Sequence, residues 1–370
     1  MTSEAFRGNR PRTTLALREW HAAAPDESAL EPELPIVDPH HHLFGSPADV
    51  QFYCATDLAR DIGAGHNVIG TVWVEAYGIG WLTSGPEELR SVGEVEQIVR
   101  ASATSIQSIY GPCAVAAGIV SNVDLRLGDR VAKVLEAHVA AAEGRLRGVR
   151  HHATYDDGTI ARFMTSAPPH LLADATFRRG LACLCPLGLS FEALVFHTQL
   201  DEVRDLADAF PDIPIVLNHV GQALGVGEHA SRRSEVFASW SAAMRTLAAR
   251  PNVYVKVGGM GMPLFGFGFE TERTPATSRA LAQAWQPYVD LAIDAFGSGR
   301  SMFESNFPVD KQSCGYTQLW NAFKLTSHAL SQDERRDLFY RTACRVYRLP
   351  ELKANGDWAW VLLPRNSHLA

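Results

Sequence analysis

Three consecutive histidines, His40, His41 and His42, directly follow the short segment "IVDP". Side chains alternate along an extended segment, so His40 and His42 share one face and His41 lies on the other. Two imidazoles on one face can converge on a metal ion or on a substrate oxygen, because neutral imidazole is a common ligand of zinc-like metals. The alternative is a polar loop that caps a buried strand. We assign His41 to that role, or to orienting a neighbouring side chain.

Two further histidines stand at the ends of apolar segments. His197 follows "LVF" and opens a stretch that suits a helix, so it is either a site residue or a polar residue at a helix start. His219, in "LNHVG", interrupts a segment that is otherwise apolar. Burying an imidazole without a partner is costly, so a functional role for His219 is favoured.

Charged side chains also stand in or at the ends of apolar segments. Arg150 and His151 lie in "LRGVRHH", and we predict that both contact substrate. The planar guanidinium of Arg150 could clamp a carboxylate, and the alternative is a salt bridge at the mouth of the site. Lys256, in "VYVKVGG", is a third candidate for substrate binding, although an interior ion pair is its favoured role.

The elements that must position these residues are short apolar segments alternating with amphipathic stretches. The strand candidates are residues 35–38, 68–76, 113–120, 146–152, 189–196, 213–220, 252–258 and 301–306. Between them, apolar residues recur at three- and four-residue steps, which is typical of amphipathic helices. Eight such strands predict an α/β fold closed into a single (β/α)8 barrel. An open doubly wound sheet is the alternative, and it is weakened because no GxGxxG follows the first strand.

The barrel predicts where a site must be. Catalytic groups of such barrels lie at the carboxyl ends of the strands. Most of the polar residues singled out above, together with Glu75 and Asn306, follow or end a predicted strand. We expect residues 1–34 to form an extended N-terminal arm, residues 35–350 the barrel and residues 351–370 a C-terminal tail.

Composition narrows the class of protein. Hydrophobic residues make up 46% of the 370 residues and the net charge is −7, with Lys and Arg spread along the chain. This is typical of a soluble globular protein and argues against nucleic acid or membrane partners. No signal peptide is recognised, so we expect a cytoplasmic protein, which could be a homo-oligomer, with its six cysteines reduced. The glycine- and aromatic-rich residues 258–269 predict a mobile loop over the mouth of the site.

The ordered set "IVDPHHHLF", "LRGVRHH", "VFHTQLDEVRDLADAFPDIPIVLNHVG", "NVYVKVGG" and "SMFESNFPVDK" resembles the amidohydrolase-2 branch of the amidohydrolase superfamily. The likeness covers roughly residues 35 to 350. It implies a distorted barrel and a hydrolase, most often a lactonase of the 2-pyrone-4,6-dicarboxylate or sugar-acid type. It also implies one divalent metal ion, usually zinc, held at His40, His42, His197 and His219. Some lactonases of this branch are metal-free, so catalysis without metal stays open.

One departure from the family matters. Members usually carry Asp in an SDxP motif after the eighth strand, and that carboxylate accepts a proton from the attacking water. Asn306 stands at this position here, and an amide cannot act as a general base. Glu75 and Asp310 are the alternative carboxylates that we favour equally. Glu304 ranks lower, because a carboxylate deeper in the barrel is more often structural.

The resemblance, together with these residues, implies a lactonase that opens a cyclic ester of a small carboxylated or sugar-acid substrate. His40, His42, His197, His219, Asn306, Glu75 and Asp310 are its candidate catalytic residues. One alternative is a metal-dependent nonoxidative decarboxylase or C–C hydrolase of the same superfamily. Another is a catalytically inactive barrel that serves for binding.

Overall fold

Eight parallel strands form one sheet in the order β1 to β8 in the computed structural model, which describes residues 6, 8, 11–76, 80–103, 109, 111–164 and 166–349. The strands are β1 (Pro35–His41), β2 (Asn67–Val74), β3 (Ala114–Asn122), β4 (Leu146–His152), β5 (Ser190–Leu194), β6 (Ile215–Leu217), β7 (Val253–Val257) and β8 (Ser301–Phe303). A parallel bridge between His41 and Phe307 joins the two ends of the sheet. The predicted (β/α)8 barrel is therefore confirmed.

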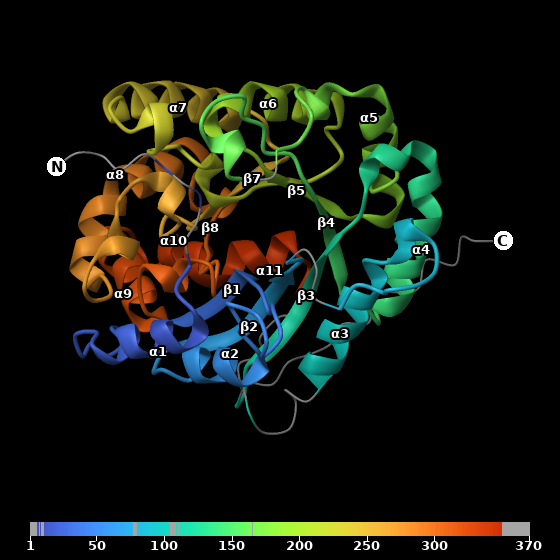
Figure 1. Cartoon of the computed structure of the whole chain (residues 1–370). Helices are drawn as coiled ribbons and strands as arrows, with labels where there is room; N and C mark the ends of the chain where they lie inside the picture. The colour runs from blue at the N-terminus through green and yellow to red at the C-terminus, as the bar shows by residue number, and fades with distance from the viewer. Residues whose placement is uncertain are drawn as a thin grey trace.

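Helices surround the strands, as Figure 1 shows. They are α1 (Thr14–Ala22), α2 (Ala55–Ile62), α3 (Val92–Ala103), α4 (Val131–Ala141), α5 (Ala175–Ala182), α6 (Leu200–Ala209), α7 (Arg233–Ala248), α8 (Ser278–Phe296), α9 (Tyr316–Thr326), α10 (Gln332–Arg336) and α11 (Thr342–Val346). In the part of the chain described, none of them is long and apolar enough to span a membrane. The predicted C-terminal tail, 351–370, lies outside the described residues.

The predicted extended N-terminal arm is wrong for residues 14–22, which form α1. Thr13 caps this helix, because its hydroxyl accepts a hydrogen bond from the backbone N–H of Ala16 at 3.2 Å. Trp20 then anchors the helix on the barrel, where its indole N–H donates to the carbonyl of Glu272 at 3.0 Å. The guanidinium of Arg12 lies 3.9 Å from the Trp20 ring centre.

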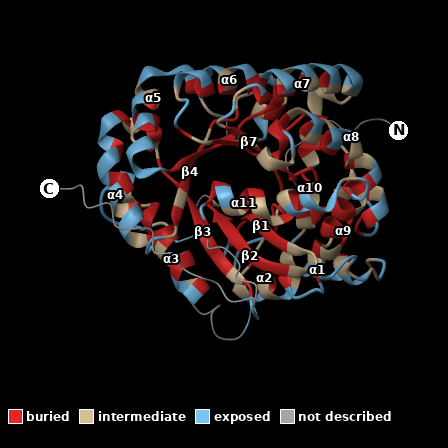
Figure 2. Ribbon diagram, turned by 180° about the vertical axis from the view of Figure 1, so that it is seen from behind, coloured by how far each residue is buried: buried red, intermediate tan, exposed pale blue. Residues whose placement is uncertain are grey.

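The apolar core has two parts, because strand residues alternate between the two faces of the sheet. One face packs against the surrounding helices, with residues such as Trp73, Ile119 and Phe303. The opposite face packs inside the barrel, with residues such as Val74, Val120 and Met302, and α11 covers this inner cluster with Val346 and Tyr347. Figure 2 shows the strands buried and the outer faces of the helices exposed.

Two strands end three residues earlier than the sequence predicts. β6 stops at Leu217 and β8 at Phe303, where the predictions extend to residues 220 and 306. The backbone leaves the extended conformation beyond these strands and enters the left-handed region at His219 and Asn306, both with a φ of 52°. Non-glycine residues adopt this region infrequently, and such residues cluster at functional sites. His219 and Asn306 therefore lie in turns above the strands.

Candidate functional site

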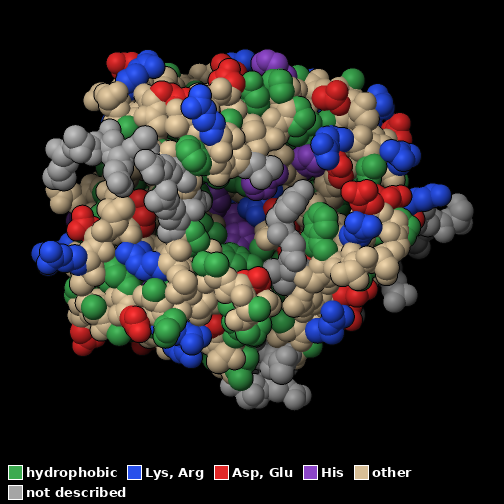
Figure 3. Space-filling view, viewed as in Figure 1, with side chains coloured by type: hydrophobic (Ala, Val, Ile, Leu, Met, Phe, Trp, Pro, Cys, Tyr) green, Lys and Arg blue, Asp and Glu red, His purple; other side chains and the backbone are tan. Residues whose placement is uncertain are grey.

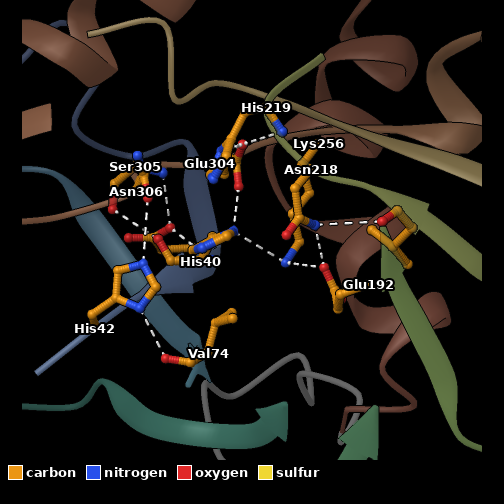
Figure 4. A network of polar contacts seen from close by, with 12 residues as sticks. His40, His42, Val74, Glu192, Asn218, His219, Lys256, Glu304, Ser305 and Asn306 are labelled. Carbon is orange, nitrogen blue, oxygen red and sulfur yellow. Dashed lines mark hydrogen bonds and ion pairs between the residues drawn. The ribbon is translucent and has the colours of Figure 1, made fainter. Parts of the chain in front are cut away.

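The inward-facing residues of the strands and of the turns after them meet around His40, as Figure 4 shows. Even-numbered positions of β4 to β8 and of the residues directly after β6 and β8 face the barrel axis. They include Arg150, Glu192, Asn218, Lys256 and Glu304. All five side chains are buried. A polar interior of this kind is stable only if its groups are paired with one another.

Glu304 lies between two of the predicted histidines. Its Oε1 is 2.7 Å from Nδ1 of His219, and its Oε2 is 2.7 Å from Nδ1 of His40. The backbone N–H of His219 also donates to Oε1, at 3.2 Å. The centres of the two imidazole rings are 4.6 Å apart. The carboxylate that the sequence places too deep for catalysis is thus the one that contacts both histidines.

Burial governs the charge of this cluster. It holds the pKa of both His40 and His219 well below the ordinary value, with Lys256 and Arg150 adding to the effect. Burial also raises the pKa of Glu304 to about 8, and the nearby Lys256 opposes that rise. The two imidazoles are therefore neutral, and each has one protonated and one unprotonated nitrogen.

His41 and His42 lie on opposite faces, as predicted. The ring of His42 is 4.9 Å from the ring of His40, whereas Nε2 of His41 lies 2.8 Å from the hydroxyl of Thr71. The Nδ1 atom of His42 is 2.9 Å from the carbonyl oxygen of Val74, so this nitrogen carries the proton. Its Nε2 lies 3.4 Å from Oδ1 of Asn306.

Arg150 and Glu75, two separate candidates from the sequence, form one buried ion pair. The Nε atom of Arg150 lies 2.5 Å from Oε1 of Glu75, and Nη2 donates to the backbone carbonyl of Glu75 at 2.6 Å. The remaining Nη1 is 3.2 Å from Nε2 of His40. The salt bridge that is the alternative role for Arg150 is therefore present. The Nη1 side of the guanidinium faces His40.

The neighbours of Arg150 differ in direction. His151 lies on the opposite face of β4, and its ring packs edge-on against Phe177 of α5 with 5.4 Å between ring centres. His152 shares the face of Arg150, as residues two apart in a strand do. The pKa of His152 is lowered to about 4 by burial, with Glu75 opposing this and Arg150 adding to it. The imidazole on the same face as Arg150 is thus that of His152. The residue predicted from the sequence to contact substrate is His151.

Lys256 forms the interior ion pair that the sequence favours. Its Nζ is 2.9 Å from Oε2 of Glu192, and both side chains are fully buried. The same carboxylate accepts hydrogen bonds from Asn218 and from the hydroxyl of Tyr347. Lys256 also approaches Nδ1 of His40, at 3.4 Å. The Lys256–Glu192 ion pair therefore lies next to His40 inside the barrel.

Asn306 contacts Asp310, another candidate from the sequence. The Nδ2 atom of Asn306 is 2.8 Å from Oδ1 of Asp310, and the backbone N–H of Gly261 donates to Oδ2 of Asp310 at 2.8 Å. Burial raises the pKa of Asp310 to about 8, and no cation forms an ion pair with it in the described part of the chain. Asp310 therefore lies behind Asn306 as seen from His42.

The contacts of His197 lie elsewhere. Its Nδ1 accepts from the backbone N–H of Leu224 at 3.4 Å, and its ring faces that of His229 at 5.3 Å. Among the described residues, the groups with three or more potential ligand atoms within 4.8 Å of one another are His40, His219 and Glu304 in one place and Asp156, Glu228 and His229 in another. Neither group includes His42 or His197, so the four histidines that the family resemblance implies do not form one cluster.

The chemistry of His40, His219 and Glu304 fits a divalent ion. Two imidazoles and one carboxylate are a common ligand set of catalytic zinc. Oε2 of Glu304 is buried, and its 2.7 Å contact with His40 lacks hydrogen-bond geometry, which leaves this oxygen without a hydrogen bond in the described structure. Arg150 and Lys256 already approach the two nitrogens of His40. An ion bound by His40 must therefore replace one of these contacts.

The segment after β7 packs its backbone directly against the cluster. Residues 258–262 are buried, which corrects the predicted mobile loop for this part of the segment. A Cβ atom on Gly258 would lie 2.5 Å from Cγ of Glu304, and one on Gly259 would lie 2.3 Å from Nδ1 of His219. Glycine at these positions lets the backbone approach Glu304 and His219 closely.

Replacing Gly259 with Ala should therefore displace His219 and lower kcat by roughly 10- to 100-fold, because small displacements of a positioned group have large kinetic effects. Gly259 has a φ of +66°, so the substitution also strains the backbone. Gly144→Ala is the matched control, because Gly144 has a φ of +78° and nothing within 4 Å of an added Cβ. Steady-state kinetics of the two variants separate the displacement of His219 from backbone strain. Equal kcat values in Gly259→Ala and Gly144→Ala would contradict the displacement of His219.

His152, on the Arg150 face of β4, lines a cavity at the carboxyl end of the barrel. Figure 3 shows histidine side chains at the bottom of a hollow in this face. A cavity of about 470 Å³ lies at the ends of β3 and β4, and its lining residues include Trp81, Asn122, Arg126 and His152. A small polar molecule fits this volume.

Glu304 ranks low among the candidate carboxylates from the sequence, and His152, Glu192 and Asn218 have no predicted role. One signal could have found two of these residues. Glu304 lies two residues before Asn306, and His152 lies two residues after Arg150 on the same face of β4. Alternation alone cannot say which pairs meet across the barrel.

Comparisons with known proteins bear on the family and on the fold of this chain. Residues 109–349 match the family model described as Amidohydrolase. The chain is 35% identical over 232 residues to the uncharacterized protein y4mH of Sinorhizobium fredii, covering 63% of this chain and 70% of that protein. It is 31% identical over 237 residues to an L-fucono-1,5-lactonase of Burkholderia multivorans, covering 64% and 72%. A crystal structure of an amidohydrolase from Burkholderia multivorans with bound zinc matches 85% of this chain and 99% of its own, at 25% identity and a TM-score of 0.63.

Proposed function

Since this chain belongs to the amidohydrolase family and is a hydrolase, we propose that it opens the ring of a sugar-acid lactone. One observation carries the proposal. The Glu304 carboxylate contacts Nδ1 of both His40 and His219, beside the guanidinium of Arg150. This arrangement combines a group that can take a proton with a cation that can stabilise negative charge, and ester hydrolysis needs both.

Proton transfer is the first role that the geometry supports. The ionised form of Glu304, which becomes the main form as the pH rises past about 8, accepts from Nδ1–H of His219 and leaves Nε2 of His219 with a lone pair. A carboxylate that fixes the tautomer of an imidazole in this way prepares its other nitrogen as a general base. His219 can then take a proton from water as the water oxygen attacks the lactone carbonyl. The same proton can return to the ring oxygen when the C–O bond breaks.

Charge stabilisation is the second role. Negative charge develops on the carbonyl oxygen as the water attacks, and a preorganised cation in a dry site lowers the energy of that state. Arg150 supplies the cation, and its pairing with Glu75 holds the guanidinium in place. His40, His219 and Glu304 are the residues that would hold a divalent ion, which would polarise the carbonyl and acidify water when bound.

The charge balance of the interior favours an uncharged lactone. Arg150 is paired with Glu75 and Lys256 with Glu192, so both interior cations already have a carboxylate partner. A dicarboxylate substrate such as a pyrone dicarboxylate would bring two further negative charges close to these carboxylates. L-Fucono-1,5-lactone, the compound named for a 31% identical relative, has none.

We therefore expect hydrolysis of L-fucono-1,5-lactone and related sugar-acid lactones, with kcat/KM at least about 100-fold above that for 2-pyrone-4,6-dicarboxylate, because unpaired buried charge is strongly disfavoured. The measurement is proton release in weakly buffered solution, with and without added Zn²⁺. A preference for the dicarboxylate would contradict the charge argument. Release of CO₂ from aromatic carboxylates without lactone hydrolysis would replace the proposal with a decarboxylase.

A further inference from the structure

The contact between His42 and Asn306 brings two hydrogen-bond acceptors together. His42 donates from Nδ1 to the carbonyl of Val74, so Nε2 of the neutral ring has only a lone pair. This nitrogen lies 3.4 Å from Oδ1 of Asn306, which also has only lone pairs. Two acceptors at this separation have no hydrogen between them, so the arrangement has no attraction.

The orientation of the Asn306 amide follows from its other neighbour. Its Nδ2 points at Oδ1 of Asp310, at 2.8 Å, which is correct if Asp310 is an ionised acceptor. Oxygen and nitrogen of an amide occupy nearly the same positions, so the hydrogen-bond network decides which is which. The state of Asp310 therefore decides what Asn306 presents to His42.

The charged and titratable groups near Asp310 give its ionised form little support. Glu304 acts on it as a second negative charge, and the Cys314 thiol on the next turn is buried beside it. The ammonium of the adjacent Lys311 turns away and binds Asp61. Gly261 donates one backbone N–H to Oδ2. One amide N–H and one side-chain amide are weak compensation for a fully buried carboxylate.

We propose that Asp310 is a neutral acid that donates a hydrogen bond to Asn306, and that the Asn306 amide in turn donates to Nε2 of His42. Oδ2 of Asp310 then accepts from Gly261, while Oδ1 carries the proton and points at the Asn306 oxygen. The amide, turned by 180°, points its N–H at His42. His42 donates onward to Val74, so all four contacts become hydrogen bonds with matched donors and acceptors.

This series of hydrogen bonds gives the amide of Asn306 a role that a carboxylate would not fill in the same way. An amide accepts on one side and donates on the other, whereas an ionised carboxylate only accepts. Asp310 is thus a positioning residue, which acts on His42 through Asn306 and fixes the ring next to His40. The lone pair of His42 Nε2 is engaged, so proton transfer falls to the Glu304 cluster.

The first test is the pH dependence of thermal stability, which does not rest on the proposed function. A carboxyl group whose pKa rises on folding from 3.8 to about 8 stabilises the folded protein most below pH 4, and this contribution is lost as the pH rises to about 8. The Asp310→Asn side chain can keep the hydrogen bonds with Gly261 and Asn306, and it has no titratable proton. Its Tm relative to the wild type should therefore rise by about 3 °C or more between pH 5 and pH 8.

Asp129→Asn is the control, because Asp129 is 80% exposed. Glu304 and other buried carboxyl groups titrate in both proteins and cancel in the difference. Parallel Tm curves for Asp310→Asn and the wild type would overturn the proposal, because Asp310 would then have the same charge at every pH tested.

The second test is kinetic and rests on the proposed function, with L-fucono-1,5-lactone as the probe. Asp310→Asn should retain kcat/KM within about threefold at pH 7 and keep its activity to higher pH than the wild type, whereas Asp310→Ala should lose about tenfold or more. A folded Asp310→Asn protein that loses 100-fold would overturn the proposal and identify Asp310 as a base. If the wild type does not hydrolyse the probe, the proposed function fails, while the stability test still decides the state of Asp310.

Discussion

Replacing Glu304 with Gln should lower kcat/KM by about 10³-fold, the largest kinetic effect expected for any single substitution in this protein. The carboxylate contacts Nδ1 of His40 and of His219, each at 2.7 Å. A glutamine amide can still accept from Nδ1–H of His219 through its oxygen, but it carries no negative charge. The imidazolium that forms when His219 takes a proton from water then loses its carboxylate partner.

The measurement is steady-state hydrolysis of the lactone by wild type and variant, with circular dichroism and Tm to show that both are folded. Glu136→Gln on the exposed face of α4 is the matched control. If Glu304→Gln keeps more than a tenth of the wild-type kcat/KM, the carboxylate is structural and another group accepts the proton. Retained affinity for Zn²⁺ in a variant without activity would show that the loss concerns proton transfer.

Replacing Lys256 with Met should cause the largest loss of stability, roughly 3–5 kcal/mol, because it leaves a buried carboxylate without its cation. Lys256 and Glu192 are both fully buried and lie 2.9 Å apart. Asn218 and Tyr347 still donate to Glu192 in the variant, but two neutral donors do not replace an ammonium. Urea unfolding of variant and wild type measures the difference.

A double variant separates the lost charge from the lost packing. Lys256→Met together with Glu192→Gln removes both charges and keeps two side chains of similar volume. It should be more stable than Lys256→Met alone, because an isolated buried charge costs more than a neutral pair. If the double variant is as unstable as the sum of the two single variants, the ion pair contributes no coupling and the loss comes from packing.

Most of the fold follows from local patterns in the sequence. Short apolar segments that alternate with amphipathic stretches give a barrel, and polar residues at the segment ends locate the site. The helix at Thr14–Ala22 was missed although Thr13 is a good N-cap residue, because the segment owes much of its stability to contacts such as that of Trp20 with Glu272. Such long-range contacts leave little trace in local periodicity.

The arrangement of the site is less predictable from sequence. Motif and spacing identify Arg150 and Glu75 as separate candidates, but their pairing depends on how two strands face each other across the barrel. Glu304 was ranked low from its depth along one strand. Its contact with His219 depends on the left-handed turn after β6 and on the close approach of Gly258 and Gly259, which alternation along single strands does not describe.

The position of Tyr347 has a consequence for the order in which the chain can fold during synthesis. Its hydroxyl reaches Glu192, which is 155 residues earlier in the chain, and it covers the floor of the barrel together with Val346. A ribosome that has released the first seven strands exposes a nascent chain whose central carboxylate lacks this partner. Domains generally fold as units, so we expect the barrel to fold completely only after α11 has left the exit tunnel.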